Sequence, residues 1–175
     1  MTDACAGTLS TSLGYAFSND ADFNKPKGFN LKYGYEWENQ LGLITSFTYL
    51  HSSEDSYPTE NGVSLKNEKT STYYSFGAGP TFRISQFISL YGLLGLSYTR
   101  NSNKSNTEDA ETSDSDESIY YNTNHATSVM YGTGANINLP DDFLLNIGFE
   151  RGSYKNENAA SKSSDTFNIN IGYKW

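Results

Sequence analysis

Apolar side chains recur at every second residue along most of this chain, and this alternation limits the folds open to it. Between residues 29 and 37 the odd positions carry Phe29, Leu31, Tyr33, Tyr35 and Trp37. The even positions carry Asn30, Lys32, Gly34 and Glu36. Strict alternation over this length is typical of a β-strand with two chemically different faces. The sequence therefore predicts an all-β fold.

The pattern occurs in eight segments, which are residues 9–17, 29–37, 41–49, 72–83, 88–98, 128–139, 143–151 and 167–175. The short connections are residues 38–40, 84–87 and 140–142, and the long ones are about 18–27, 52–69, 100–125 and 153–165. Short and long connections alternate, so they lie at opposite ends of an antiparallel up-and-down barrel. We expect one domain over residues 1–175, with residues 1–7 as a flexible tail.

The composition excludes several classes of protein. Aromatic residues make up 15% of the chain, which argues against disorder despite a mean hydropathy of -0.61. A net charge of -8 argues against a nucleic-acid partner. Cys5 is the one cysteine, so no intramolecular disulfide can form, and we interpret it as an incidental tail residue. No apolar run approaches the length of a transmembrane helix.

The first residues, MTDACAGTLSTS, contain neither a basic segment nor an apolar core of a signal peptide. Either the protein is cytosolic, or the sequence is a mature chain with a starting Met; we take it as mature. The choice depends on which strand face is the core. In a soluble barrel of the lipocalin kind, the apolar parity would face inward.

Gly, Ser and Asn dominate the polar parity, and small residues suit the narrow interior of an eight-stranded barrel. Charged residues on this parity can pair inside a lumen, whereas in lipid each would cost a few kcal/mol. The sequence thus predicts a transmembrane barrel. The expected polar network of the lumen consists of Lys32, Glu36, Tyr73, Arg83, Tyr91, Glu150 and Lys174.

Strands of about 9–11 residues match a tilted membrane crossing. Aromatic residues near the strand ends predict the interfacial girdles of such barrels. The expected girdle residues are Phe17, Trp37, Tyr49, Tyr74, Phe82, Tyr98, Phe143, Tyr173 and Trp175. Pro80 cannot donate to a ladder, so we expect it near the short-turn end, where a bulge or ladder end tolerates it.

The blocks KGFNLKYGYEWEN, LGLITSFTYLH, GPTFRISQFISLYGLLGLSY, YGTGANINLP and the terminal IGYKW resemble the OmpX/Ail/Lom family of outer-membrane proteins. The resemblance covers all eight strands and fades in the long loops. It implies an eight-stranded barrel in the outer membrane of a Gram-negative bacterium, in contact with lipopolysaccharide. It also implies a role in host-cell adhesion, invasion or complement resistance through host cell-surface, matrix or complement-regulatory proteins. Trp175 departs from the Phe that usually ends these chains.

No catalytic constellation is present. His51 and His125 fall in or beside long loops, and no nucleophile elbow or metal-ligand spacing occurs. Glu36 and Glu150 have basic neighbours on the lumen parity, so we interpret them as structural ion-pair partners. We expect a monomer that is not an enzyme and has no cofactor or metal. The alternatives are a small channel or a purely structural protein, and a lipid-modifying barrel enzyme is the least favoured.

The long loops are the candidate extracellular binding surface. The segment NTEDAETSDSDES, residues 106–118, is acidic without any basic residue, which is typical of a solvated cap; an ion-binding or protein-binding patch is the alternative. The fifth strand need not stop at Tyr98, and the sixth can begin at Ile119. We therefore expect a wall of strands above the membrane. Its candidate contact residues are Tyr57, Val63, Glu108, Asp109, Glu111, Asp114, Asp116, Glu117, Ile119 and Tyr121.

Overall fold

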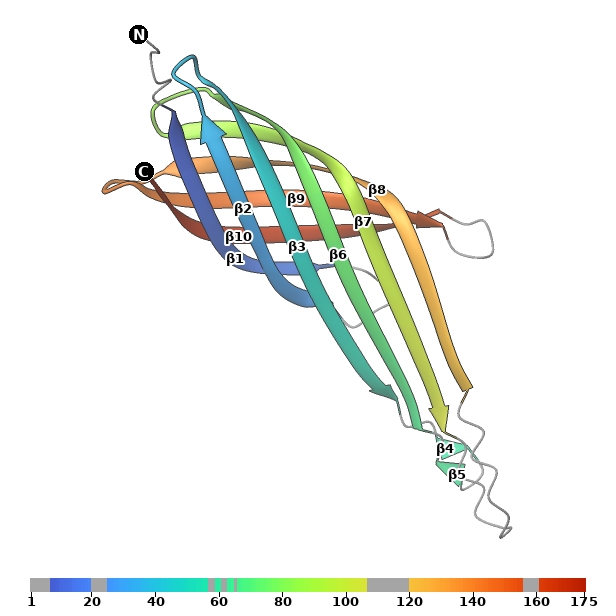
Figure 1. Ribbon diagram of the computed structural model, residues 1–175. Helices are drawn as coiled ribbons and strands as arrows, with labels where there is room; N and C mark the ends of the chain where they lie inside the picture. Colours follow the sequence, from blue (N-terminus) through green and yellow to red (C-terminus); the bar gives the residue numbers. More distant parts are fainter. Residues whose placement is uncertain are drawn as a thin grey trace.

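The computed structural model describes residues 7–19, 25–56, 59–60, 63–64, 66–106, 120–155 and 161–175. They form a closed antiparallel barrel in the order β1-β10-β9-β8-β7-β6-β3-β2 (Figure 1). Its strands are β1 (Thr8–Ser18), β2 (Lys27–Glu36), β3 (Leu41–Ser56), β6 (Lys66–Arg83), β7 (Ile88–Asn106), β8 (Tyr120–Asn138), β9 (Phe143–Lys155) and β10 (Ser161–Lys174). A separate pair, β4 (Thr59–Glu60) and β5 (Val63–Ser64), follows β3. The predicted eight-stranded barrel is confirmed.

Tight turns join the strands at one end of the barrel. Gln40 adopts φ 70° in the β2–β3 turn, and Asp141 and Asp142 adopt φ 61° and 62° in the β8–β9 turn. Short polar side chains such as Asp tolerate this left-handed region better than most residues. The N–H of Trp37 donates to the carbonyl of Leu41 at 2.8 Å and closes the first of these turns. We call this end the short-turn end and the opposite one the long-loop end.

Pairing of β1 with β10 closes the cylinder. Leu9 and Trp175 exchange two backbone hydrogen bonds of 3.0 Å, so the start of β1 and the end of β10 lie at the short-turn end (Figure 1). Register partners followed from Thr81 through each strand in turn lead back to β6 at Tyr73, eight residues nearer the long-loop end. A row of register partners, followed from β6 to β7 and onward around the barrel, therefore shifts towards the long-loop end by about one residue per strand.

The two parities separate onto the two faces of the wall. Large apolar side chains face outward, and Phe76 and Leu94 are 60% and 66% exposed. Buried polar side chains such as Asn30, Ser46 and Asn146 fill the interior. This inversion of the usual arrangement follows from the alternation, because successive side chains of a strand point to opposite faces.

Pro80 lies three residues before Arg83, the end of β6 nearest the short turns, and is opposite Leu43 of β3. The ladder between β6 and β7 omits Gly79 and Pro80, while the register on either side of them is unchanged. Proline has no N–H to donate, which accounts for the interruption. A side chain at Gly79 would collide with the backbone of Gly92, since an added Cβ would lie 1.9 Å from its carbonyl oxygen.

Four adjacent strands are the longest of the barrel. β3, β6, β7 and β8 have 16, 18, 19 and 19 residues, whereas β1, β2, β9 and β10 have 11, 10, 13 and 14. Residues 52–56, 66–71, 101–106 and 120–129 of these four strands extend beyond their shorter neighbours and form what we call the protruding sheet (Figure 1). The strands thus reach well into the ranges expected as loops. Within the described residues, no helix is long and apolar enough to cross a membrane.

Candidate functional site

Glu150 of β9 is the centre of a polar network inside the barrel. Its side chain is 1% exposed. One carboxylate oxygen accepts a hydrogen bond from Ser46 at 2.8 Å, and the other accepts from Thr48 at 2.9 Å and Ser75 at 3.1 Å. A buried carboxylate needs such donors, because it has left water and would otherwise be uncompensated.

Lys32 of β2 supplies the positive charge of the same network and is 2% exposed. Its ammonium donates to the side-chain oxygens of Asn30 and Asn168, the latter at 2.6 Å. The amide nitrogen of Asn30 donates to Ser46, Thr48 and Glu150. Lys32 and Glu150 are therefore linked through the Asn30 side chain, and their charges are balanced across an amide.

Apolar clusters lie on either side of this network. Ala16, Leu50 and Tyr73 pack together towards the long-loop end, one layer beyond the donors to Glu150. Ile44, Tyr91 and Leu93 pack together towards the short-turn end. A polar core enclosed by two apolar layers leaves little room for a continuous water path.

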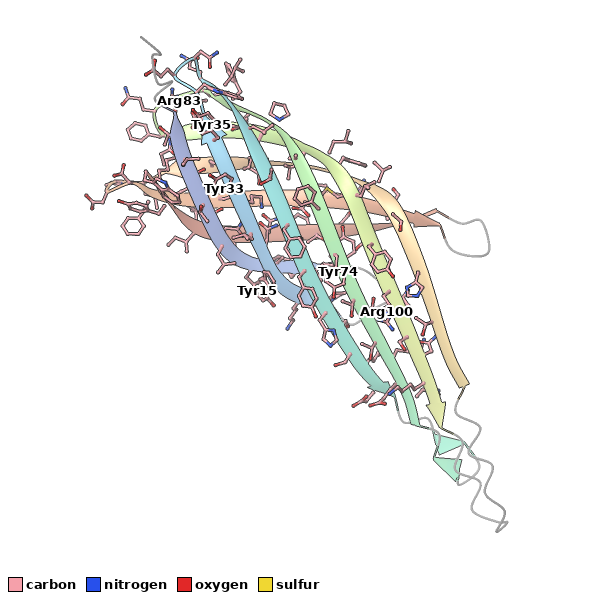
Figure 2. The ribbon with its side chains drawn as sticks, in the orientation of Figure 1. Tyr15, Tyr33, Tyr35, Tyr74, Arg83 and Arg100 are labelled. Carbon is pink, nitrogen blue, oxygen red and sulfur yellow. The ribbon has the colours of Figure 1, made fainter. Side chains whose placement is uncertain are left out.

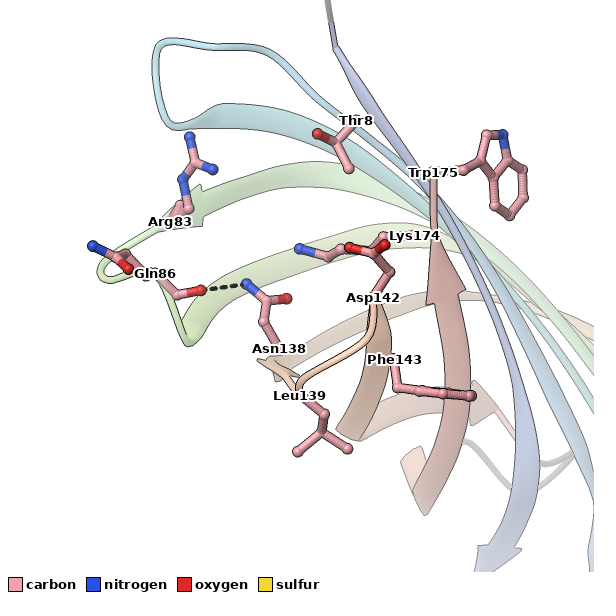
Figure 3. A pocket seen from close by; sticks show the side chains of 9 residues that line it. All are labelled: Thr8, Arg83, Gln86, Asn138, Leu139, Asp142, Phe143, Lys174 and Trp175. Carbon is pink, nitrogen blue, oxygen red and sulfur yellow. Dashed lines mark hydrogen bonds between the residues drawn. The ribbon is translucent and has the colours of Figure 1, made fainter.

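A second charged group lies at the short-turn mouth. Glu36 pairs with the guanidinium of Arg83 at 3.2 Å and with the ammonium of Lys174 at 3.8 Å. Arg83 and Lys174 also line a pocket of about 400 Å³, together with Asp142 and Trp175 (Figure 3). Asn138 donates to the carbonyl of Gln86 at 2.9 Å at its edge (Figure 3).

The predicted girdle residues lie on the outer face in two groups. Tyr49 packs between Phe29 and Tyr74 in tilted ring contacts, with ring centroids 5.5 Å and 5.2 Å away, and belongs to the group near the long-loop end. Figure 2 shows Tyr74 on the outer side of the wall. Phe17 and Tyr98 complete this group, whereas Trp37, Phe82, Phe143, Tyr173 and Trp175 lie near the short turns. Two aromatic bands separated by apolar surface fit two membrane–water interfaces.

An outward-facing ion pair lies beside the aromatic band near the long-loop end. Arg151 and Asp165, which are register partners on β9 and β10, form a bidentate salt bridge. Nε and Nη2 of Arg151 donate to the two carboxylate oxygens at 2.5 Å and 2.7 Å. The sequence analysis did not select either residue. Both lie at the long-loop ends of their strands, and the switch from apolar to charged residues on the outward parity is the signal that could have identified them.

Among the described residues, no strand pairs with the β8 edge of the protruding sheet. β9 pairs with β8 only from Met130 to Asn138, whereas β7 pairs with β8 as far as Tyr120. On the opposite edge, β2 pairs with β3 only as far as His51, whereas β6 pairs with β3 as far as Ser56. The protruding sheet thus has a long edge on β8 and a short one on β3.

The seven expected lumen residues divide into two groups. Lys32, Tyr73, Tyr91 and Glu150 are buried at mid-barrel, whereas Glu36, Arg83 and Lys174 meet at the mouth. The amides of the mid-barrel network were not identified from the sequence, although all five lie on the polar parity: Asn30, Asn136, Asn146, Asn168 and Asn170.

Most of the candidate binding residues lie outside the described part of the chain, namely Tyr57, Glu108, Asp109, Glu111, Asp114, Asp116, Glu117 and Ile119. Val63 belongs to β5 and Tyr121 to β8. Of the two histidines, His51 belongs to β3 and His125 to β8. In the described ranges, no three His, Cys, Asp or Glu side chains gather into a site that could hold a metal ion.

A closed eight-stranded antiparallel barrel with an apolar outer surface, two aromatic bands and a filled polar lumen defines the class of small transmembrane β-barrels. The long-loop and short-turn ends of such barrels are extracellular and periplasmic, respectively.

Comparison with known proteins identifies the family within this class. Residues 5–174 match the model of the outer membrane protein beta-barrel domain. The chain is 36% identical to the attachment invasion locus protein of Yersinia enterocolitica over 83% of this chain and 76% of that protein. It is 33% identical to outer membrane protein X of Escherichia coli K12 over 97% and 87% of the two chains.

A solved structure agrees with these relatives. The crystal structure of Ail, the attachment invasion locus protein of Yersinia pestis, in complex with the heparin analogue sucrose octasulfate superposes with a TM-score of 0.73 at 28% identity, covering 97% of this chain and 99% of that one. The chain belongs to the OmpX/Ail/Lom family of eight-stranded barrels and resides in the bacterial outer membrane.

Proposed function

We propose that this protein is an adhesion barrel that binds an extended segment of a host protein along the free β8 edge. The names of the Yersinia relatives, attachment invasion locus protein, support a role in attachment. The observation that carries the proposal is the set of unpaired backbone groups on this edge. An exposed strand edge is a template on which another chain can add a strand.

The hydrogen-bond pattern identifies the free groups. The N–H of Asn138 donates to Phe87 on the β7 side, and the N–H of Leu139 donates to Phe143 on the β9 side. Successive residues of an antiparallel strand bond to alternate neighbours. The β7–β8 register continues without a bulge to Tyr120, so the odd residues of β8 direct their backbone groups towards β9.

The last residue of β8 that pairs with β9 is Met130, and Val129 adjoins that pair. Four odd residues lie beyond Val129, and they are Tyr121, Thr123, His125 and Thr127. Each presents one N–H and one C=O at the edge. They are one Tyr, two Thr and one His. None is a proline or a lysine, the residues that commonly protect strand edges from pairing. This edge therefore lacks the usual protection against strand addition.

The β3 edge is a weaker candidate. The N–H of Trp37 donates to Leu41, so odd residues of β3 bond towards β2. Of the odd residues of β3 that the structure describes, Ser53 and Asp55 lie beyond His51, the last residue paired with β2. Two residues make a short ladder, and the exposed carboxylate of Asp55 discourages pairing.

Replacing Thr127 by Pro tests the proposal. Its N–H faces the free edge, so proline removes an intermolecular donor and leaves the β7–β8 ladder intact. Thr127→Ala is the matched control, because it removes the same side chain and keeps the N–H. Bacteria producing each variant are assayed for adherence to cultured epithelial cells, with a heat-modifiable band on gels as the check of folding.

We expect adherence of the folded Thr127→Pro variant to fall to that of bacteria without the protein, while Thr127→Ala retains it. Equal adherence of the two folded variants would show that the β8 edge does not bind the host protein. Loss of adherence in both variants would show that the host protein contacts the Thr127 side chain and not its N–H.

The lipid partner follows from the outer surface of the barrel. Three features lie at about the same height above the short-turn end, when the shift of one residue per strand is included. They are Lys27, the Arg151–Asp165 pair and the long-loop aromatic band. Cationic groups at this level suit the phosphates of lipopolysaccharide. A small channel is not favoured, because the apolar layers on either side of Glu150 close the lumen.

A further inference from the structure

A row of four residues on the outer face of the protruding sheet leads to the free β8 edge. We call it the basic row, because three of its members are His or Arg. His51, Thr72, Arg100 and His125 are successive register partners on β3, β6, β7 and β8. Side chains of one row lie on the same face of a sheet. Figure 2 shows Arg100 on the extended part of β7. His125, the last member, is also one of the four residues with free backbone groups.

Tyr98 orients the His125 side chain. The Tyr98 hydroxyl lies 2.6 Å from Nδ1 of His125, and the two rings stack with centroids 5.8 Å apart and an angle of 20°. The hydroxyl can donate to the neutral ring and accept from the protonated one, so the contact persists through titration. The other ring nitrogen, Nε2, remains for a neighbour on the strand edge.

The surroundings of His125 are positive. From β7, Arg100 lies directly opposite and Tyr98 contacts the ring. On β8 itself, Thr123 and Thr127 are the neighbours on the same face, and neither is charged. The β9 ladder ends before this height. No carboxylate forms an ion pair with Arg100 in the part of the chain that the structure describes.

We infer that the strand bound at the β8 edge carries an Asp or Glu side chain opposite His125, and that protonation of His125 strengthens its binding. This inference rests on the proposed function. A residue paired with His125 places its side chain on the same face, with Cβ atoms about 5 Å apart. Its carboxylate then lies beside the imidazole of His125, and only β8 separates it from Arg100 on β7.

The pH window follows from the two groups. A carboxylate is ionised above about pH 4.3 and an ordinary histidine is protonated below about pH 6.5. The attraction is strongest near the middle of this range and decreases as the pH rises and the imidazole loses its proton. Arg100 keeps its charge throughout, so a weaker attraction remains at neutral pH.

Height above the bilayer favours a protein partner over a lipid. Lys27 of β2 is in the same row as His51, but the row climbs by about one residue per strand towards His125. His125 therefore lies about four residues farther out than Lys27. Its ring rests on Tyr98 at the outer margin of the aromatic band, at the free strand edge, where a docked strand can reach it.

The test uses the complete protein in nanodiscs of zwitterionic lipid and two ten-residue peptides of alternating Thr and Val. One peptide has a central Glu and the other a central Gln. Binding is measured near pH 5.5 and 7.5 from the NMR shifts of backbone amides on β8. We expect the Glu peptide to bind about fivefold more tightly at the lower pH and the Gln peptide to show no such change.

His125→Gln should bind the Glu peptide equally at both pH values, and Arg100→Gln should weaken it at both. Equal, pH-independent binding of the two peptides would overturn this inference while leaving strand addition intact. Absence of edge shifts with either peptide would refute the proposed function as well. Shifts at His125 that require anionic lipid instead of peptide would assign the basic row to the membrane.

Discussion

Removal of the Glu150 carboxylate is the most direct test of how the lumen stabilises the barrel. Glu150→Ala takes the acceptor away from Ser46, Thr48 and Ser75 and leaves Lys32 as a buried charge without its counter-charge. Breaking a buried charge pair costs about 3–5 kcal/mol, and each hydrogen bond to a charged group contributes about 1.5–3 kcal/mol. Because Ser and Thr hydroxyls can reorient towards one another, we expect the free energy of unfolding to fall by about 3–5 kcal/mol.

Glu150→Gln keeps the size of the side chain and should cost less, about 1–3 kcal/mol, because the hydroxyls can accept from its amide. Glu36→Gln is the matched control at the mouth, where Arg83 is one-third exposed and water can replace the lost contacts. We expect that change to cost less than about 1 kcal/mol.

The assay is reversible urea unfolding in lipid vesicles, followed by the fluorescence of the two tryptophans, Trp37 and Trp175. Combining Glu150→Gln with Lys32→Met should cost about 1–2 kcal/mol less than the sum of the two single changes, since Asn30 couples the charges. If Glu150→Ala costs no more than Glu36→Gln, the network does not stabilise the barrel as described.

Three further predictions concern other parts of the molecule. In planar bilayers the protein should show no stepwise conductance, and steady large openings would mean that the layers containing Leu50 and Tyr91 do not seal the lumen. Amide exchange in micelles should be slow at Ala126, which bonds to β7, and fast at His125 and Thr127, which face the free edge; uniformly fast exchange across 120–129 would contradict the protruding sheet. Replacing the six acids of 106–118 by Asn or Gln should leave folding and host-cell binding unchanged, and loss of a salt-sensitive interaction would instead identify a binding patch.

Local pattern was sufficient to predict the class of fold. The period of two assigns each residue to one of two faces whatever its partner, so the outward position of Phe76 and the inward position of Lys32 followed from parity alone. The short turns followed from interruptions of the same pattern, such as residues 38–40. The even number of strands then placed both termini at one end.

Parity does not determine height, and height decides which lumen residues meet. Sequence analysis expected basic neighbours beside both Glu36 and Glu150. The barrel instead pairs Glu36 directly with Arg83 and Lys174, while Glu150 reaches Lys32 only through Asn30. The stagger of eight residues around the barrel sets these distances, and it arises only when β1 and β10 close the sheet.

The free edge likewise depends on tertiary structure. The sequence indicated that the strand now seen as β8 could begin near Ile119, and the strand does begin at Tyr120. Whether β9 accompanies it could not be predicted, because pairing between neighbouring strands depends on where both leave the barrel. Pairing between β8 and β9 ends at Met130. The backbone groups of His125 and Thr127 that point away from β7 therefore have no partner among the described strands, and Arg100 lies opposite His125 on β7.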